Sequence, residues 1–414
     1  MGRKMIAAMA MGVALMMMAD AAWGQVTALP RGVWRGWLES AGGELPFEME
    51  FFEEGEGCSV AIINASDRTV LPGVAFDHSE VVIPIPHFDA ELRGRLVDGG
   101  SRIDGMWMKV TRDGKRVEMP FHAVRGERRR FPDAAPPAEG VEITGKWKAM
   151  FAESGEAVGE FRLGEEPGTV LGTFLTPTGD FGHLSGVMDG RTLRLSTFDG
   201  AHAFLFTAEV QGENELSGEF ISGSTWREAW TAQRDGTAAV PDGFSQVTWN
   251  HAVNIWHIPV TNSFGEIGTL EDELGGNTGL VVELMGTWCP NCVDAGRMLE
   301  ELRREIPNPQ MVQVVGVAFE YTPDVARSLK QIAAFKQHFG IGYPVLLGGV
   351  ADRKKIPEVV KGLSEMRSFP TTIFARRDGH VIAVHSGFSG PATGEEHAKL
   401  REKFKRLMEE CAQR

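Results

Sequence analysis

The chain has 414 residues, which is enough for two or three domains with buried cores. Acidic residues outnumber basic ones by 56 to 42, and the formal net charge of −14 argues against a nucleic-acid or anionic-membrane partner. A hydrophobic content of 43% excludes a disordered chain, and 4 cysteines are too few for a disulfide scaffold.

Residues 1–24 are predicted to be a secretory signal peptide. Arg3 and Lys4 precede an apolar run over residues 5–19, and Ala22-Trp23-Gly24 offers a small-x-small cleavage site. The apolar run is shorter than the ~20 residues of a membrane-spanning helix, although an uncleaved anchor is the alternative. We therefore expect a periplasmic protein with no stable membrane insertion after cleavage, in a compartment where disulfides persist.

Residues 25–131 and 143–236 are predicted to be two β-rich repeats, joined by a charged, proline-bearing linker at 132–142. Short alternating segments broken by Gly, Asp and Asn are typical of antiparallel sandwiches or barrels. Short motifs recur about 110 residues apart, which indicates a duplication. Gly32-Val33-Trp34 returns as Gly145-Lys146-Trp147, and Gly105-Met106-Trp107 as Gly218-Glu219-Phe220. Residues 174–180 are a candidate surface loop of the second repeat.

Residues 237–414 are predicted to form an α/β domain, because apolar strand-like runs now alternate with helical ones. Strands are expected at 280–285, 311–319, 344–347, 371–375 and 381–385. Helices are expected at 293–305, 324–339, 352–362 and 395–411.

The sharpest chemical feature is Trp288-Cys289-Pro290-Asn291-Cys292, where a predicted strand ends and a helix begins. Two cysteines three residues apart on the first turn of a helix are close enough to form a disulfide. The helix N-terminus favours an anion, so we expect Cys289 to be the attacking thiolate. Cys292 faces inward and can displace a captured partner by attacking the mixed disulfide.

Other interpretations of the cysteines have less support. A zinc site needs about four ligands, and no second cysteine pair is present. An inert structural disulfide stays open as an alternative. Cys58 and Cys411 are more consistent with free thiols, although a long-range bridge between them also stays open. The 11 histidines show no ligand spacing, so we predict neither a metal nor another cofactor.

Residues 281–292 read VVELMGTWCPNC, and this segment resembles the active-site strand and turn of thioredoxin-fold proteins. It is most similar to the TlpA-like thiol-disulfide oxidoreductases of bacterial envelopes. The resemblance continues through residues 343–347 and 369–374 and covers roughly the C-terminal 170 residues. It implies a thioredoxin-like domain with the insertion, here at about 320–352, of the TlpA- and peroxiredoxin-like branches. The expected fold class is therefore multidomain, with two tandem antiparallel β-rich units followed by an α/β thioredoxin-like domain.

The resemblance also implies roles for residues around the cysteines. Pro370 matches a cis-proline that packs against the pair and leaves a neighbouring backbone free for an extended substrate. Trp288 and Phe369 are expected to form the rim of the site, where Pro290 and Asn291 would also meet the substrate.

Glu283 lies six residues before Cys289 and matches the buried acid beneath the active site of thioredoxins. A carboxylate on an otherwise apolar strand should have a raised pKa, which suits it to take the proton from Cys292. The family more often has Asp or a neutral residue here. Strand parity leaves open that the side chain points outward instead.

The predicted function is an exported thiol-disulfide oxidoreductase, working as a disulfide reductase on protein thiols and disulfides of the envelope. The resemblance implies a membrane electron donor, and the β-rich half would select substrates or make oligomer contacts. One alternative is a peroxiredoxin-like thiol peroxidase, although Cys289 occupies the place of the hydroxyl residue expected three positions before a peroxidatic Cys292. The other is an envelope binding protein that uses the α/β domain as a scaffold.

Overall fold

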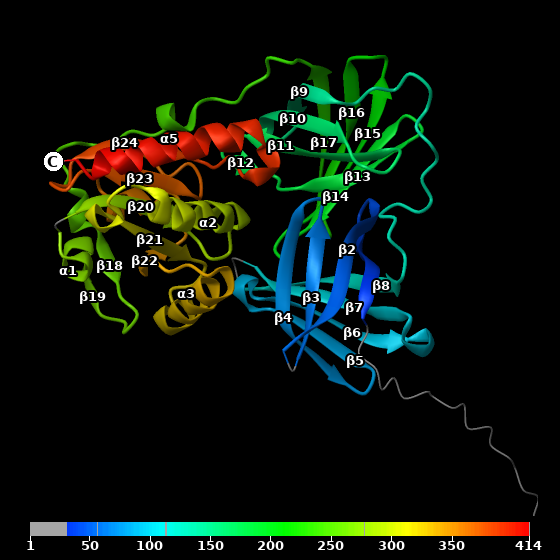
Figure 1. The fold of residues 1–414 in the computed structure, drawn as a ribbon, viewed down its shortest axis with the longest axis horizontal. Helices are drawn as coiled ribbons and strands as arrows, with labels where there is room; N and C mark the ends of the chain where they lie inside the picture. Colours follow the sequence, from blue (N-terminus) through cyan, green and yellow to red (C-terminus); the bar gives the residue numbers. More distant parts are fainter. Residues whose placement is uncertain (1–30, 56, 112–113, 277, 414) are drawn as a thin grey trace, which may run out of the picture.

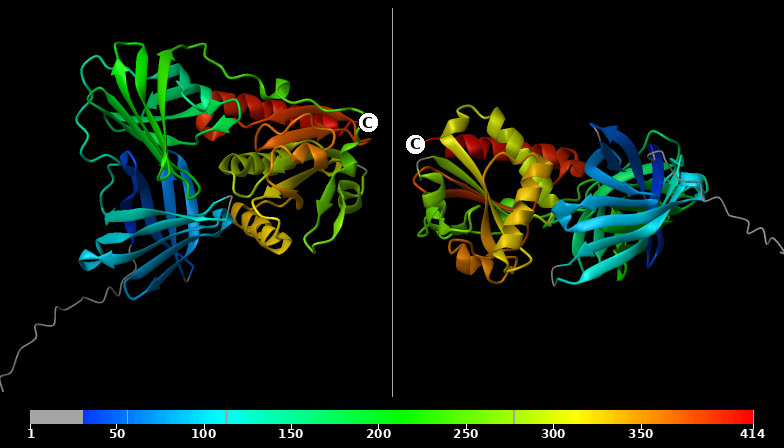
Figure 2. Two further views of the ribbon diagram at one scale, coloured as in Figure 1. Left: turned by 180° about the vertical axis from the view of Figure 1, so that it is seen from behind. Right: turned by 90° about the horizontal axis from the view of Figure 1, so that it is seen from below.

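The computed structural model describes residues 31–55, 57–111, 114–276 and 278–413. Two β-barrels lie on one side of the molecule and a domain of mixed helices and strands on the other (Figures 1 and 2). The predicted signal peptide lies outside the described residues. No helix within the described ranges is long and apolar enough to cross a membrane.

The first barrel is an antiparallel meander that closes because its first strand pairs with its eighth. Its inward-facing side chains include the fully buried Trp34, Phe47 and Phe121, as the alternating sequence predicts. The strands are β1 (Gly32–Ser40), β2 (Gly43–Glu54), β3 (Gly57–Asn64), β4 (Asp67–Asp77), β5 (Glu80–Ile85), β6 (Ala90–Val97), β7 (Arg102–Val110) and β8 (Arg116–Arg125).

The second barrel closes through the pairing of β10 with β11, and the two-residue strand β12 (Gly179–Asp180) extends the sheet beyond β11. Its core is aromatic, and Phe151 lies between Trp230 and Phe174 at ring distances of 5.9 and 5.2 Å. The other strands are β9 (Gly145–Phe151), β10 (Gly155–Leu163), β11 (Thr169–Thr176), β13 (Leu184–Asp189), β14 (Thr192–Phe198), β15 (Ala203–Gln211), β16 (Glu215–Ser222) and β17 (Trp226–Arg234).

The repeated sequence motifs lie at equivalent places in the two barrels. Trp34 in β1 and Trp147 in β9 are both fully buried in the first strand of their barrel. Gly105 in β7 and Gly218 in β16 lie where adjacent strands come too close for a side chain. An added Cβ would stand 2.0 Å from the Arg93 oxygen at the first site and 1.8 Å from the Thr207 oxygen at the second. The shared glycines therefore mark the same close approach of strands.

The α/β domain has one mixed sheet of order β19-β18-β22-β21-β20-β23-β24, in which β20 and β22 run parallel to β21. Helices α2 and α5 lie side by side and are joined by an ion pair between Glu305 and Arg401, while α3 packs against β22. Its strands are β18 (Pro259–Thr261), β19 (Ile267–Thr269), β20 (Gly279–Met285), β21 (Val312–Glu320), β22 (Val345–Val350), β23 (Thr371–Ala375) and β24 (Val381–Ser386). Its helices are α1 (Leu270–Leu274), α2 (Pro290–Glu305), α3 (Val325–Phe339), α4 (Ile356–Val359) and α5 (Glu395–Cys411).

The predicted fold class, two tandem antiparallel units followed by an α/β domain, is confirmed. The helix predicted at 352–362 is wrong, because only α4 is helical in that segment. After α4 the chain pairs with a distant segment instead: Leu363 forms a β-bridge with Trp249, and the Asn250 N–H donates to the Gly362 oxygen at 2.7 Å. This tertiary pairing replaces the remaining helical hydrogen bonds.

Candidate redox site

The two cysteines of the predicted motif lie together at the start of α2. Cys289 is the residue that caps the helix, Pro290 is its first helical residue, and Cys292 follows in the first turn. The side chain of Cys289 interacts with that of Cys292, and both are free thiols in the structure. Cys289 is 8% exposed and Cys292 is fully buried. A partner can therefore reach Cys289 before Cys292.

The surroundings of Cys292 hold its proton in place. Burial raises the pKa of this thiol well above its ordinary value, and the nearby Cys289 and Glu283 raise it further. A helix N-terminus, in contrast, stabilises negative charge on the residue that caps it, which is Cys289. The two thiols therefore differ in exposure and in the charges and dipoles around them.

Glu283 lies on β20 and is fully buried, so the outward orientation left open by the sequence is excluded. Burial raises the pKa of its carboxyl to about 8, and Cys292 is among the groups with which it interacts. The Tyr343 hydroxyl donates a hydrogen bond of 2.9 Å to Oε2, while Oε1 has no partner. Tyr343 was not among the predicted site residues, and its only sequence signal is its place at the start of a segment included in the family resemblance.

The loop before β23 faces Cys289. The peptide bond between Phe369 and Pro370 is cis, as the resemblance implies. The Cys289 thiol lies 3.5 Å from the Phe369 carbonyl oxygen, to which it donates. The Pro370 oxygen accepts from the Gly387 N–H at 3.0 Å, which ties this loop to the segment after β24.

The loop between β20 and α2 is held by the end of β21. Trp288 donates through Nε1 to the Phe319 oxygen at 3.0 Å, stacks on Tyr321 at 4.5 Å, and meets the ring edge of Phe369 at 5.1 Å. The Glu320 carboxylate accepts from the N–H of Thr287 at 3.0 Å and from its hydroxyl at 2.8 Å. Glu320 was not predicted as a site residue.

The second barrel touches the redox motif through residues 176–180, here called the β11–β12 turn. The Asn291 amide donates to the Asp180 carbonyl oxygen at 3.2 Å, and an added Cβ at Gly179 would stand 2.4 Å from the Asn291 nitrogen. The Asp180 carboxylate also accepts from the Gly390 N–H at 2.5 Å. The candidate surface loop at 174–180 is therefore a strand end and turn that packs on the α/β domain.

Two cavities flank the start of α2. One, of about 320 Å³, is lined by residues of both barrels and by Pro290, Asn291 and Asp294 of α2. The other, of about 260 Å³, lies between the first barrel and the α/β domain, and Thr287 and Trp288 line it. We call this second space the Trp288 cavity.

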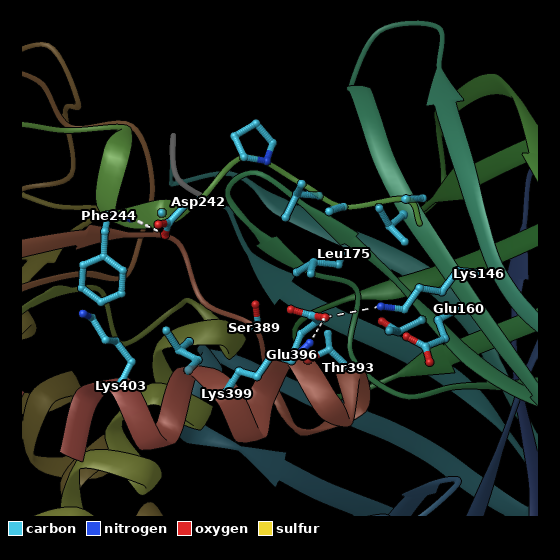
Figure 3. A pocket seen from close by; sticks show the side chains of 18 of the residues that line it. Lys146, Glu160, Leu175, Asp242, Phe244, Ser389, Thr393, Glu396, Lys399 and Lys403 are labelled. Carbon is cyan, nitrogen blue, oxygen red and sulfur yellow. Dashed lines mark hydrogen bonds and ion pairs between the residues drawn. The ribbon is translucent and has the colours of Figure 1, made fainter. Parts of the chain in front are cut away.

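A further cavity of about 410 Å³ lies away from the motif, between the second barrel, residues 238–244 and α5 (Figure 3). Lys146 of β9 and Lys399 of α5 both reach the Glu396 carboxylate, at 3.3 and 3.1 Å. The pair of Lys146 with Glu396 joins the second barrel to α5, whereas the pair of Lys399 with Glu396 lies within the helix.

The remaining predictions about cysteines and metals concern other parts of the molecule. Cys58 is a buried free thiol in β3, and Cys411 is a buried free thiol at the end of α5. Among the described residues, no group of three or more His, Cys, Asp or Glu side chains is arranged to hold a metal ion.

No family model matches the sequence, and no curated protein matches it. A thioredoxin-family thiol:disulfide interchange protein from Chlorobium tepidum is 16% identical over 39% of this chain and 99% of that chain, with a TM-score of 0.28. A secreted disulfide oxidoreductase from Mycobacterium tuberculosis is 17% identical over 36% and 96%, with a TM-score of 0.26. A thiol-disulfide oxidoreductase from Bacteroides fragilis is 15% identical over 36% and 99%, with a TM-score of 0.27. These neighbours are thioredoxin-like disulfide oxidoreductases that match part of the chain, and we draw no functional argument from them.

Proposed function

We propose that this protein is an exported, periplasmic thiol-disulfide oxidoreductase that reduces disulfides of envelope proteins. One observation carries the proposal: Cys289, which keeps 8% of its surface exposed, caps a helix, and the fully buried Cys292 lies in the first turn of that helix and interacts with the carboxyl of Glu283. A structural disulfide requires neither the helix N-terminus nor the buried acid.

The reaction begins when the Cys289 thiolate attacks one sulfur of a partner disulfide. A Cys289–partner disulfide forms, and the other partner sulfur leaves as a thiolate that takes a proton. Cys292 then gives its proton to Glu283 and attacks the Cys289 sulfur. The second partner sulfur leaves and takes a proton, so the partner gains two electrons and two protons while Cys289 and Cys292 become a disulfide. A membrane dithiol donor would reduce that disulfide by the reverse exchange.

The test is reduction of insulin by the mature protein in the presence of dithiothreitol. We expect Cys289→Ser to abolish activity and Cys292→Ser to accumulate a mixed disulfide with the substrate, detected by mass spectrometry. Activity that survives Cys289→Ser would reject the proposal. Equilibration with glutathione buffers then gives the direction: a potential near ~−270 mV supports a reductase, and one near ~−120 mV an oxidant.

A further inference from the structure

One side of the redox motif is closed by the protein's own second barrel. The β11–β12 turn contacts Asn291 inside the motif and reaches Gly387, where an added Cβ would stand 3.0 Å from the Pro177 oxygen. The side-chain amide of Gln246, which follows the segment between the second barrel and the α/β domain, donates to the same Pro177 oxygen at 3.0 Å. A partner segment that lies over the cysteines therefore meets the second barrel at this end of the motif.

The opposite side of the motif opens into the Trp288 cavity. Trp288 is the residue before Cys289 and lines this space. Its ring packs nearly perpendicular to that of Phe369, whose carbonyl oxygen lies 3.5 Å from the Cys289 sulfur. The far wall belongs to the first barrel, through Phe88 and Val110. The cavity is thus lined by the residue directly before Cys289, and its outer wall is not part of the α/β domain.

The lining of the Trp288 cavity favours an uncharged occupant. Trp288 stacked on Tyr321 forms one wall, and Pro323, Phe88 and Val110 add apolar surface. The charged side chains that line it are already engaged: Glu320 accepts from Thr287, and Arg327 pairs with Asp89. Burial lowers the pKa of His87 to about 3, so this residue is neutral at physiological pH. A charged occupant would lose its hydration without gaining a free counter-ion. The cavity therefore disfavours a charged side chain.

We propose that the Trp288 cavity binds an aromatic or branched aliphatic side chain next to the reactive cysteine of an extended partner segment. The first barrel then takes part in choosing substrates by completing the wall of this subsite. The inference rests on the proposed function, because it concerns the partner that Cys289 attacks. The α/β domain alone would supply only the Trp288 side of the subsite.

The experiment uses two peptides that carry glutathione on a single cysteine and differ only in the preceding residue, Phe or Asp. Release of glutathione by an excess of the pre-reduced mature protein, whose own dithiol supplies the two electrons, gives a second-order rate constant for each peptide. We expect wild type to prefer the Phe peptide by about tenfold or more, the range for one well-filled apolar pocket. Equal values overturn the inference and leave the proposed function intact, whereas release from neither peptide contradicts the proposed function itself.

A pair of matched variants tests whether filling the cavity removes the preference for the Phe peptide. Gln331 on α3 lines it, whereas Gln337 on the same helix is exposed and does not. Gln331→Trp should remove most of the preference for the Phe peptide, and Gln337→Trp should keep it. Gln337→Trp should also release glutathione from the Asp peptide at close to the wild-type rate.

A second pair of variants, in the first barrel, keeps the inference testable if Gln331→Trp does not fold. Val110→Trp places the new ring on the far wall, and Val70→Trp places it on β4, which does not line the cavity. We expect loss of the preference only for Val110→Trp, in protein whose thermal unfolding matches wild type. If both cavity-filling variants fold and keep the preference, the subsite lies elsewhere and the inference is wrong.

Discussion

At the scale of single residues, Glu283 has an environment that suits it to exchange a proton with Cys292. Its carboxyl is fully buried with a pKa of about 8, and only one of its two oxygens has a hydrogen-bond partner. The ionised form is the base, so attack by Cys292 should accelerate as pH rises toward 8 and level off above it. We expect Glu283→Gln to slow this step by about 100-fold and to abolish that rise. Rapid mixing with a mixed-disulfide substrate, followed by acid quench, measures the rate of attack by Cys292 at each pH.

Capture of the substrate by Cys289 is the internal control for Glu283→Gln, since that step needs no proton from Cys292. The capture rate should stay within about twofold of wild type, which is far below the range for loss of a general base. An unchanged attack by Cys292 with the same pH profile would exclude Glu283 as the base.

Tyr343 tunes the same carboxyl. Its hydroxyl donates to Oε2 of Glu283, and this bond lowers the pKa of a group that burial raises. In Tyr343→Phe the ionised carboxylate loses this donor, so the inflection in the rate of Cys292 attack should move to higher pH. The pH profile, measured from 6 to 10, separates this positioning role from simple loss of packing, which would lower the rate without moving the inflection. A shift to lower pH would contradict the assigned role.

The residues that sequence could predict are those whose partners lie nearby in the chain. Cys289, Cys292 and Pro290 occupy one turn, so their spacing alone places them together. Glu283 was matched through the family resemblance, and strand parity left its orientation open until the fold placed it in the core. Tyr343 and Glu320 come from other segments, and sequence cannot show that their side chains turn toward β20 and its following loop. Asn291 was predicted to meet a substrate, but its amide binds the second barrel, and a role toward substrate stays a prediction.

At the scale of elements, the β11–β12 turn is fitted to the redox motif by the absence of a side chain at Gly179. We expect Gly179→Ala to push the turn away from Asn291, because the new Cβ would stand 2.4 Å from the amide nitrogen. The variant should lose about 1–3 kcal/mol of stability, as overpacked sites do. Alkylation of Cys289 by iodoacetamide should become faster, which mass spectrometry measures.

Gly182 is the matched control for this variant, because it lies in the same segment with nothing within 4 Å of an added Cβ. Its φ of +70° adds backbone strain to the alanine variant, so some loss of stability is expected there too. Alkylation of Cys289 should nevertheless stay at the wild-type rate in Gly182→Ala. Equal acceleration in both variants would show that general loosening, and not the contact with Asn291, controls access.

Elements were predictable where their signal is local. The alternation of apolar and polar residues in the N-terminal half predicted the two β-rich units. The helix predicted at 395–411 is α5. Closure of the second barrel depends on the pairing of β10 with β11, which alternation does not encode. The prediction of a helix at 352–362 was wrong for the same reason. The end of that segment pairs with the chain around Trp249, which lies more than 100 residues earlier.

At the scale of the whole molecule, the placement of the barrels on the α/β domain decides how the redox site is approached. The second barrel is held by the contacts at Asn291 and by the ion pair of Lys146 with Glu396 (Figure 3). The first barrel is held at its 3-10 helix, Pro86–Phe88, against α3, where Asp89 pairs with Arg327. No local sequence pattern encodes these contacts, so the sequence could assign the barrels no more than a general role in substrate selection or oligomer contacts.

The contact between the first barrel and α3 includes two stacked histidines, and it should loosen in acid. The rings of His87 and His338 lie 3.8 Å apart. Burial, together with His338 and Arg297 and against the effect of Asp199, lowers the pKa of His87 to about 3. Burial and the Arg297 cation lower the pKa of His338 to about 4. Separated domains would return both rings to a pKa near ~6.5, so only the separated state takes up protons between pH 6.5 and 4.

Docking of the first barrel should therefore be fully stable above pH 6.5 and weaken as pH falls, by up to about 1.4 kcal/mol per pH unit for the buried His87 and by less for the partly exposed His338, where solvent screens the charge. Hydrogen exchange of α3 and of Pro86–Phe88, measured from pH 7 to 4.5 and corrected for intrinsic rates, should show the loss of protection. The double variant His87→Phe, His338→Gln keeps a packed interface without groups that titrate in this range, and its protection should stay constant. The ion pair of Asp89 with Arg327 is common to both proteins, so equal losses would assign the effect to that pair and contradict the role of the histidines.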